Sequence, residues 1–117
     1  MYKIRLKGEN KMDQIFQIGD SILTVDLPAE LDHPNAEQIS RQIDEILQEQ
    51  YIRGIVFDFS KTTFMDSSGI GMIMGRYKAL GMRQGSIRAI RVNRRISKIL
   101  NLSGIHKVMK ICCREEE

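Results

Sequence analysis

The sequence predicts a single α/β domain with a mixed β-sheet and helices packed against that sheet. Three observations support this fold class. The chain has 117 residues, a length that suits one domain. Its hydrophobic share of 42% and charged share of 28% are ordinary for a globular domain. After an initial hairpin, segments with strand character alternate with segments of helical periodicity, as in folds whose parallel strands are connected through helices.

The N-terminal part predicts an appendage followed by a hairpin. Residues 1–11 begin with alternating apolar and basic side chains, as in an edge strand, before a polar break. Two apolar-rich segments, 14–18 and 21–27, flank Gly19-Asp20, which indicates a tight turn. We expect a loop over residues 28–32 after the hairpin.

A first helix is predicted from Asp32 to Gln50. Asp32 is a favourable N-cap, and Pro34 suits the first helical turn. The apolar positions that follow have helical spacing and define the buried face. They are Ala36, Ile39, Ile43, Ile46 and Leu47.

A buried strand and a second helix are expected next. Residues 52–59 form a nearly continuous apolar run, typical of a central strand covered on both faces. A connecting loop over 60–65 leads to a helix that begins at Ser67 or Ser68 and ends before Gly81. The predicted apolar stripe of this helix comprises Ile70, Ile73, Met74, Tyr77 and Leu80.

The C-terminal part predicts a strand, a short helix and a final strand. The strand covers residues 86–92, and Asn93 is expected to cap the helix. Ser103-Gly104 ends that helix, and residues 108–112 form the last strand. The acidic end of the chain is expected to be loose.

We divide the chain into an N-terminal extension (1–11), one domain (12–113) and an acidic tail (114–117). No apolar run approaches the roughly 18 residues needed to cross a bilayer. The charged start also lacks the apolar core of a signal peptide. The sequence therefore predicts a cytoplasmic location, where Cys112 and Cys113 would stay reduced.

Charge is distributed unevenly along the chain. Residues 1–66 carry 12 acidic and 7 basic groups, whereas residues 67–117 carry 11 basic and 3 acidic groups. Such a bipolar chain is either simply solvated or steers a charged partner. The basic segment 88–98 has no interleaved aromatic residues and no nucleic-acid-binding motif, so we favour a solvated or protein-facing surface over direct contact with nucleic acid.

The sequence offers no catalytic constellation. Ser67 and Ser68 lack the preceding glycine of a nucleophile elbow, and no Walker loop is present. A serine nucleophile also needs a base, and the chain has only His33 and His106. His33 could approach Ser67 in space, although a histidine at a helix start is more often just exposed. No enzyme activity, cofactor or metal is predicted.

The run Phe64-Met65-Asp66-Ser67-Ser68-Gly69-Ile70-Gly71 leaves a buried strand and opens a helix. Its polar residues can cap the free amides of the helix start, which is a sufficient structural role. The same position also suits a modified serine, because free amides and the helix dipole stabilise a phosphate. That phosphate would add roughly −1.5 to −2 charges beside Asp66. On the residues alone, both interpretations stay open.

Two motifs resemble the anti-sigma factor antagonists of the STAS domain family, close to the sporulation type that frees sigma F. One is Glu30-Leu31-Asp32-His33 followed by Ala36-Glu37. The other is the run 64–71, continued by Gly75-Arg76-Tyr77-Lys78, and the later Leu102-Ser103-Gly104-Ile105 also fits. The similarity spans about residues 12–112. It departs from the family at Pro28-Ala29, where a glycine is frequent.

The resemblance implies a STAS-like fold and a binding switch. The unphosphorylated form would bind an anti-sigma factor that is also a serine kinase, and so release its sigma factor. Phosphorylation of Ser67 by that kinase would end the complex, and a PP2C-type phosphatase would reset it. Ser68 is then left for capping or close contact. The implied partner-binding residues are Asp32, His33, Asp66, Ser67, Ser68, Gly69, Ile70 and Gly71.

The basic segment without a binding motif and the lack of a membrane-length apolar run predict no direct contact with nucleic acid or membrane. Two alternatives remain beside the sigma switch. The glycine-rich helix start could receive a nucleotide phosphate, which would make the chain a nucleotide-binding STAS module. The chain could also be a subunit of a stress-signalling scaffold.

Overall fold

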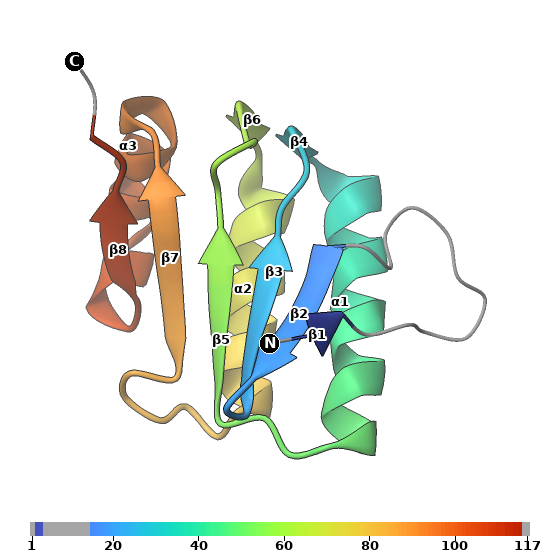
Figure 1. The fold of residues 1–117 in the computed structure, drawn as a ribbon. Coiled ribbons are helices and arrows are strands. Elements are labelled where there is room, and N and C mark those ends of the chain that lie inside the picture. The colour runs from blue at the N-terminus through green and yellow to red at the C-terminus, as the bar shows by residue number, and fades with distance from the viewer. Residues whose placement is uncertain (1, 4–14, 116–117) are drawn as a thin grey trace.

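A computed structural model describes residues 2–3 and 15–115 of the chain (Figure 1). Within this part, a six-stranded mixed sheet has the order β1-β2-β3-β5-β7-β8, and β4 and β6 form a separate two-stranded sheet. The strands are β1 (Tyr2–Lys3), β2 (Phe16–Gly19), β3 (Ile22–Asp26), β4 (Glu30–Leu31), β5 (Gly54–Asp58), β6 (Phe64–Met65), β7 (Ile87–Val92) and β8 (Lys110–Cys113). The helices are α1 (His33–Glu49), α2 (Ser67–Ala79), α3 (Arg94–Ser103) and the 3₁₀ helix η2 (Ile105–Lys107). The predicted α/β class with a mixed sheet is confirmed.

All three α-helices pack on one face of the main sheet. Leu23, Ile55 and Ile87 lie directly opposite one another in β3, β5 and β7, and all three are buried. They belong to one hydrophobic core that also contains buried residues of α1, α2 and α3. Figure 1 shows these helices behind the sheet. The expectation that residues 52–59 are covered on both faces is therefore wrong, because helices cover β5 on one face only.

The hairpin at the start of the sheet turns one residue later than predicted. Gly19 still pairs with Ile22 in the β2–β3 ladder. The two turn residues are Asp20 and Ser21, both with positive φ of 54° and 62°. A two-residue turn in which both residues have positive φ matches the twist of the flanking strands. Tyr2–Lys3 pairs with β2 as the predicted edge strand, whereas residues 4–11 lie outside the described part.

The helix boundaries follow their capping residues. Asp32 caps α1 and Asn93 caps α3, as predicted, and Gly104 ends α3 with a φ of +85°. In α2, the buried face is rotated from the predicted stripe. Met72 and Ile73 are buried there, whereas the side chains of Ile70, Met74 and Tyr77 are half-buried. No helix of the described part is both long and apolar enough to cross a membrane.

Two segments that were expected to be loops contain short strands. Glu30–Leu31 lies in the segment 28–32, and Phe64–Met65 lies in the segment 60–65. They pair in parallel, Glu30 with Phe64 and Leu31 with Met65. Strands of two residues have no periodicity that a sequence pattern can reveal, so only the tertiary pairing defines them. In Figure 1 they lie side by side, each leading directly into a helix.

Candidate functional site

The two-stranded sheet brings the starts of α1 and α2 together. Leu31 of β4 and Met65 of β6 are partners in the parallel register. The residues that follow them, Asp32 and Asp66, therefore leave the two strands side by side. The amide of Asp66 also donates a hydrogen bond of 3.4 Å to the carbonyl of Leu31. Both aspartates are N-caps, which places two helix N-termini and two capping carboxylates next to each other.

Capping at α2 is done by the aspartate and not by either serine. The Asp66 carboxylate accepts a 2.9 Å hydrogen bond from the amide of Ser68. The prediction that Ser68 caps α2 is therefore wrong. Ser67 is the first residue of α2, and its side chain is exposed. Among the described residues, no hydrogen-bond partner is recorded for the Ser67 hydroxyl, so this hydroxyl is free for a partner or a modification.

A contact between His33 and Ser68 links the two helix starts. The Nδ1 atom of His33 lies 3.3 Å from the hydroxyl of Ser68. The sequence allowed an approach of His33 to Ser67, but the contact in the structure is with Ser68. The close-contact role expected of Ser68 stays a prediction. Among the described residues, the ring of His33 is in hydrogen-bond contact with Ser68 and not with Ser67.

Gly69 allows α2 to sit directly on the two-stranded sheet. A Cβ atom at this position would lie 2.7 Å from Cγ of Met65 and 2.9 Å from a methyl group of Leu31. Both distances are shorter than a van der Waals contact, and both neighbours are buried. Gly69 thus fixes where the helix start can lie. Of the remaining predicted site residues, Gly71 is exposed, whereas Ile70 is half-buried against the core.

Phe64 is a surface residue that our list of site residues omitted. It lies in β6, three positions before Ser67, and 50% of its surface is exposed. Aromatic side chains, including phenylalanine, are enriched in protein interfaces. Its place in the motif was visible in the sequence. Its exposure was not, because an apolar residue after a buried strand is normally expected to join the core.

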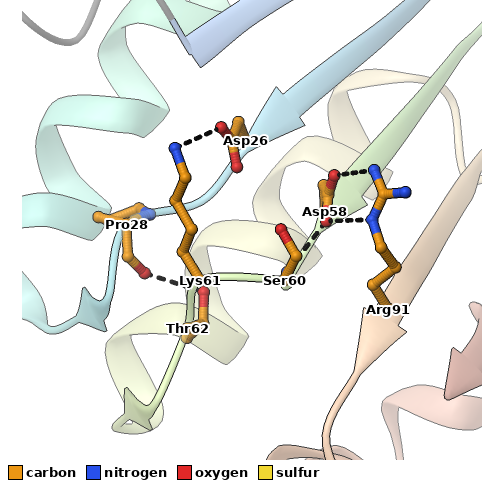
Figure 2. A network of polar contacts seen from close by, with 7 residues as sticks. All are labelled: Asp26, Pro28, Asp58, Ser60, Lys61, Thr62 and Arg91. Atoms are coloured by element: carbon orange, nitrogen blue, oxygen red, sulfur yellow. Dashed lines mark hydrogen bonds and ion pairs between the residues drawn. The ribbon is translucent and has the colours of Figure 1, made fainter. Parts of the chain in front are cut away.

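A polar network supports the loop that leads from β5 to Ser67 (Figure 2). The Asp58 carboxylate accepts a 2.9 Å bond from the amide of Ser60 and pairs with the Arg91 guanidinium. Arg91 has a φ of +54° at an irregularity of the β7–β8 ladder. Burial raises the pKa of Asp58, but the bonds from Arg91 and Ser60 outweigh burial, so the pKa of this carboxyl is below its ordinary value.

The same loop is tied to the segment before α1. The hydroxyl of Thr62, which is fully buried, donates a 2.9 Å bond to the carbonyl of Pro28. The amides of Thr63 and Phe64 donate to the carbonyl of Ala29, at 2.8 and 3.1 Å. Figure 2 shows the contact at Pro28 together with the ion pair of Lys61 and Asp26. Pro28-Ala29 therefore contributes backbone carbonyls, which any residue types would supply.

Fold and site together define a small α/β domain in which an exposed serine begins one helix, next to the two aspartates that cap α1 and α2. The chain belongs to the STAS domain family, whose family model matches residues 14–117. It is similar to an anti-sigma F factor antagonist of Paenibacillus polymyxa, at 38% identity over 90 residues that cover 77% of each chain. An anti-sigma-B factor antagonist of Listeria monocytogenes is 26% identical over 73 residues, which cover 60% of this chain and 64% of the relative.

Solved structures agree with these relatives. The unphosphorylated anti-sigma factor antagonist SpoIIAA superposes with a TM-score of 0.72 at 28% identity, covering 82% of this chain and 86% of the other. A structure described as the Bacillus cell fate determinant SpoIIAA in the phosphorylated form gives a TM-score of 0.64 at 28% identity, covering 82% and 89%. The resemblance inferred from the two sequence motifs is confirmed.

Proposed function

We propose that this protein is an anti-sigma factor antagonist whose binding state is set by phosphorylation of Ser67. The unphosphorylated form binds an anti-sigma factor that is also a serine kinase, and this binding releases the sigma factor. The observation that carries the proposal is the exposed, unbonded hydroxyl of Ser67 at the first position of α2. A kinase can reach it without unfolding any element of the domain.

The surroundings of Ser67 explain how a phosphate would act as a switch. The free amides and the dipole of the α2 start tolerate an added anion, so the fold can survive the modification. A partner surface that fits beside Asp66 and Asp32, however, would meet roughly −1.5 to −2 additional charges. A loss of about 3 kcal/mol of binding free energy weakens affinity by on the order of a hundredfold, which suffices for a switch.

The partner class follows from the relatives. Of two relatives named as anti-sigma F factor antagonists, one is 38% and the other 26% identical, whereas relatives named as anti-sigma-B factor antagonists are 26% or 24% identical. The identity of 38% exceeds the other three values. This difference favours a partner of the sigma F type and a role in sporulation, in the bacterial cytoplasm where sigma factors act. In this scheme the protein is a substrate of the kinase and of a PP2C-type phosphatase, and not an enzyme itself.

Substitution of Ser67 tests the proposal. The probe is the anti-sigma F factor of Paenibacillus polymyxa with ATP and magnesium. We expect intact-mass measurements to show one added phosphate on the wild type and on Ser68→Ala, and none on Ser67→Ala. Ser67→Asp should bind the probe at least about tenfold more weakly than Ser67→Ala, because it carries the negative charge permanently. Equal affinity of the Asp and Ala variants, with no phosphate at Ser67, would overturn the proposal.

A further inference from the structure

A groove lies between α1 and α2, and its lining includes Ser68, the residue next to the candidate phosphorylation site. Its volume is about 340 Å³. His33 and Ser68, the two residues whose side chains link the helix starts, both belong to its lining. The complete lining comprises His33, Ala36, Glu37, Ser40, Arg41, Ser68, Gly71 and Met72. Because Ser68 directly follows Ser67, a protein that reaches the hydroxyl of Ser67 also lies next to this groove.

The α1 side of the groove carries two opposite charges. Glu37 and Arg41 follow His33 by one and two turns of the helix, and both are exposed. Their spacing is that of a stabilising Glu–Arg pair on a helix. Nevertheless, no ion pair of either residue is recorded among the described residues. Further along α1, Asp44 does pair with Arg76 of α2, at 3.2 Å. Among the described residues that line the groove, Glu37 and Arg41 therefore carry charges without an ion-pair partner.

The α2 side of the groove is open at Gly71. No heavy atom lies within 4 Å of the position that a Cβ atom of Gly71 would occupy. The same is true of Gly75, one turn later on α2, but Gly75 does not line the groove. A side chain at position 71 would therefore fill the groove without disturbing the fold, and a side chain at position 75 would not fill it.

We propose that this groove receives a segment of the anti-sigma factor, which places a basic side chain opposite Glu37 and an acidic one opposite Arg41. The inference rests on the proposed function and deepens it. Phosphorylation of Ser67 decides whether the protein binds. The two charged groove residues of α1, Glu37 and Arg41, which we call the α1 rail, decide which partner it binds. Charges at an interface rim suppress wrong partners by like-charge contact more than they add affinity, so this rail distinguishes among related anti-sigma factors.

Charge reversal tests the rail against a matched control. Glu37→Arg and Arg41→Glu should each weaken binding of the Paenibacillus polymyxa anti-sigma F factor about tenfold in titration calorimetry. Glu45→Arg makes the same charge change on an exposed residue of α1 that does not line the groove. It should leave affinity within about twofold of the wild type.

Filling the groove provides a second, uncharged test. Gly71→Leu should weaken binding about tenfold, while its melting temperature stays at or above that of the wild type because glycine disfavours helices. Gly75→Leu should gain similar stability and keep its affinity. The groove proposal is wrong if three variants all bind with wild-type affinity while Ser67 is still phosphorylated: Glu37→Arg, Arg41→Glu and Gly71→Leu. The phosphorylation switch would be unaffected by that result. If the wild type neither binds the anti-sigma F factor nor becomes phosphorylated, both the switch proposal and the groove proposal are wrong.

Discussion

The exposed position of Ser67 depends on Gly69, a nearby residue without a side chain. Its exposure requires the start of α2 to rest on the two-stranded sheet, and Gly69 makes this contact. Any Cβ atom there would meet Met65 and Leu31 at distances that require a shift of the helix start or of both buried side chains. The glycine therefore acts on the site through packing, although it carries no functional group.

We predict that Gly69→Ala destabilises the protein although alanine is the better helix former. Overpacking a buried contact costs about 1–3 kcal/mol, whereas the gain in helix propensity is at most about 0.5–1 kcal/mol. Gly75→Ala is the matched control on the same helix, since its Cβ atom meets nothing within 4 Å. It should be stabilising by about 0.5–1 kcal/mol. Urea denaturation measures both, and a Gly69→Ala protein as stable as Gly75→Ala would contradict the packing argument.

At the scale of elements, the loop between β5 and β6 is held from both sides. On one side the Asp58 carboxylate, at the end of β5, bonds to the amide of Ser60 and pairs with Arg91 of β7. On the other, Thr62 bonds to the carbonyl of Pro28, before β4. The side chain of Asn93 adds a 3.0 Å bond to the carbonyl of Thr62. The position of β6, and so of the α2 start, is therefore fixed by three other elements.

Asp58→Asn is predicted to weaken this loop in a pH-dependent way. The pKa of Asp58 is lowered from 3.8, so its stabilising effect is complete above that value and is lost as the pH falls through the lower folded-state pKa. At pH 7 the variant should be less stable by about 1–2 kcal/mol, and the difference should shrink below about pH 4. Urea denaturation over this pH range checks it.

Asp26→Asn is the control for this element. Asp26 pairs with Lys61 at the surface, where an ion pair contributes little. Its effect should stay below about 0.5 kcal/mol at pH 7. If Asp58→Asn has the same stability as Asp26→Asn at every pH, the pair of the buried Asp58 carboxylate with Arg91 does not stabilise the loop.

At the scale of the whole molecule, one core joins the helices to one face of the sheet. Buried residues of β2, β3, β5 and β7 and of all three α-helices belong to the same cluster. The opposite face of β5 carries Val56, which is only half-buried. Since all described helices share a single core, we expect the domain to unfold as one cooperative unit.

Ile55→Ala is predicted to destabilise the entire domain without uncoupling its parts. Ile55 is buried at the centre of the core, so its truncation should cost about 2–5 kcal/mol. Val56→Ala, its neighbour on the other face, should cost about 1 kcal/mol or less. Thermal unfolding followed by far-ultraviolet circular dichroism and by tyrosine fluorescence should give coincident transitions for both variants. Separate transitions would contradict a single core.

The sequence by itself determined the α/β class, the helix caps at Asp32 and Asn93, and the motif around Ser67, because local periodicity and capping chemistry are properties of neighbouring residues. The tertiary structure alone decided which face of β5 is covered and that β4 pairs with β6. It also decided that His33 meets Ser68 and that Arg91 pairs with Asp58. These contacts join residues more than 30 positions apart, and a local pattern carries no information about such pairing.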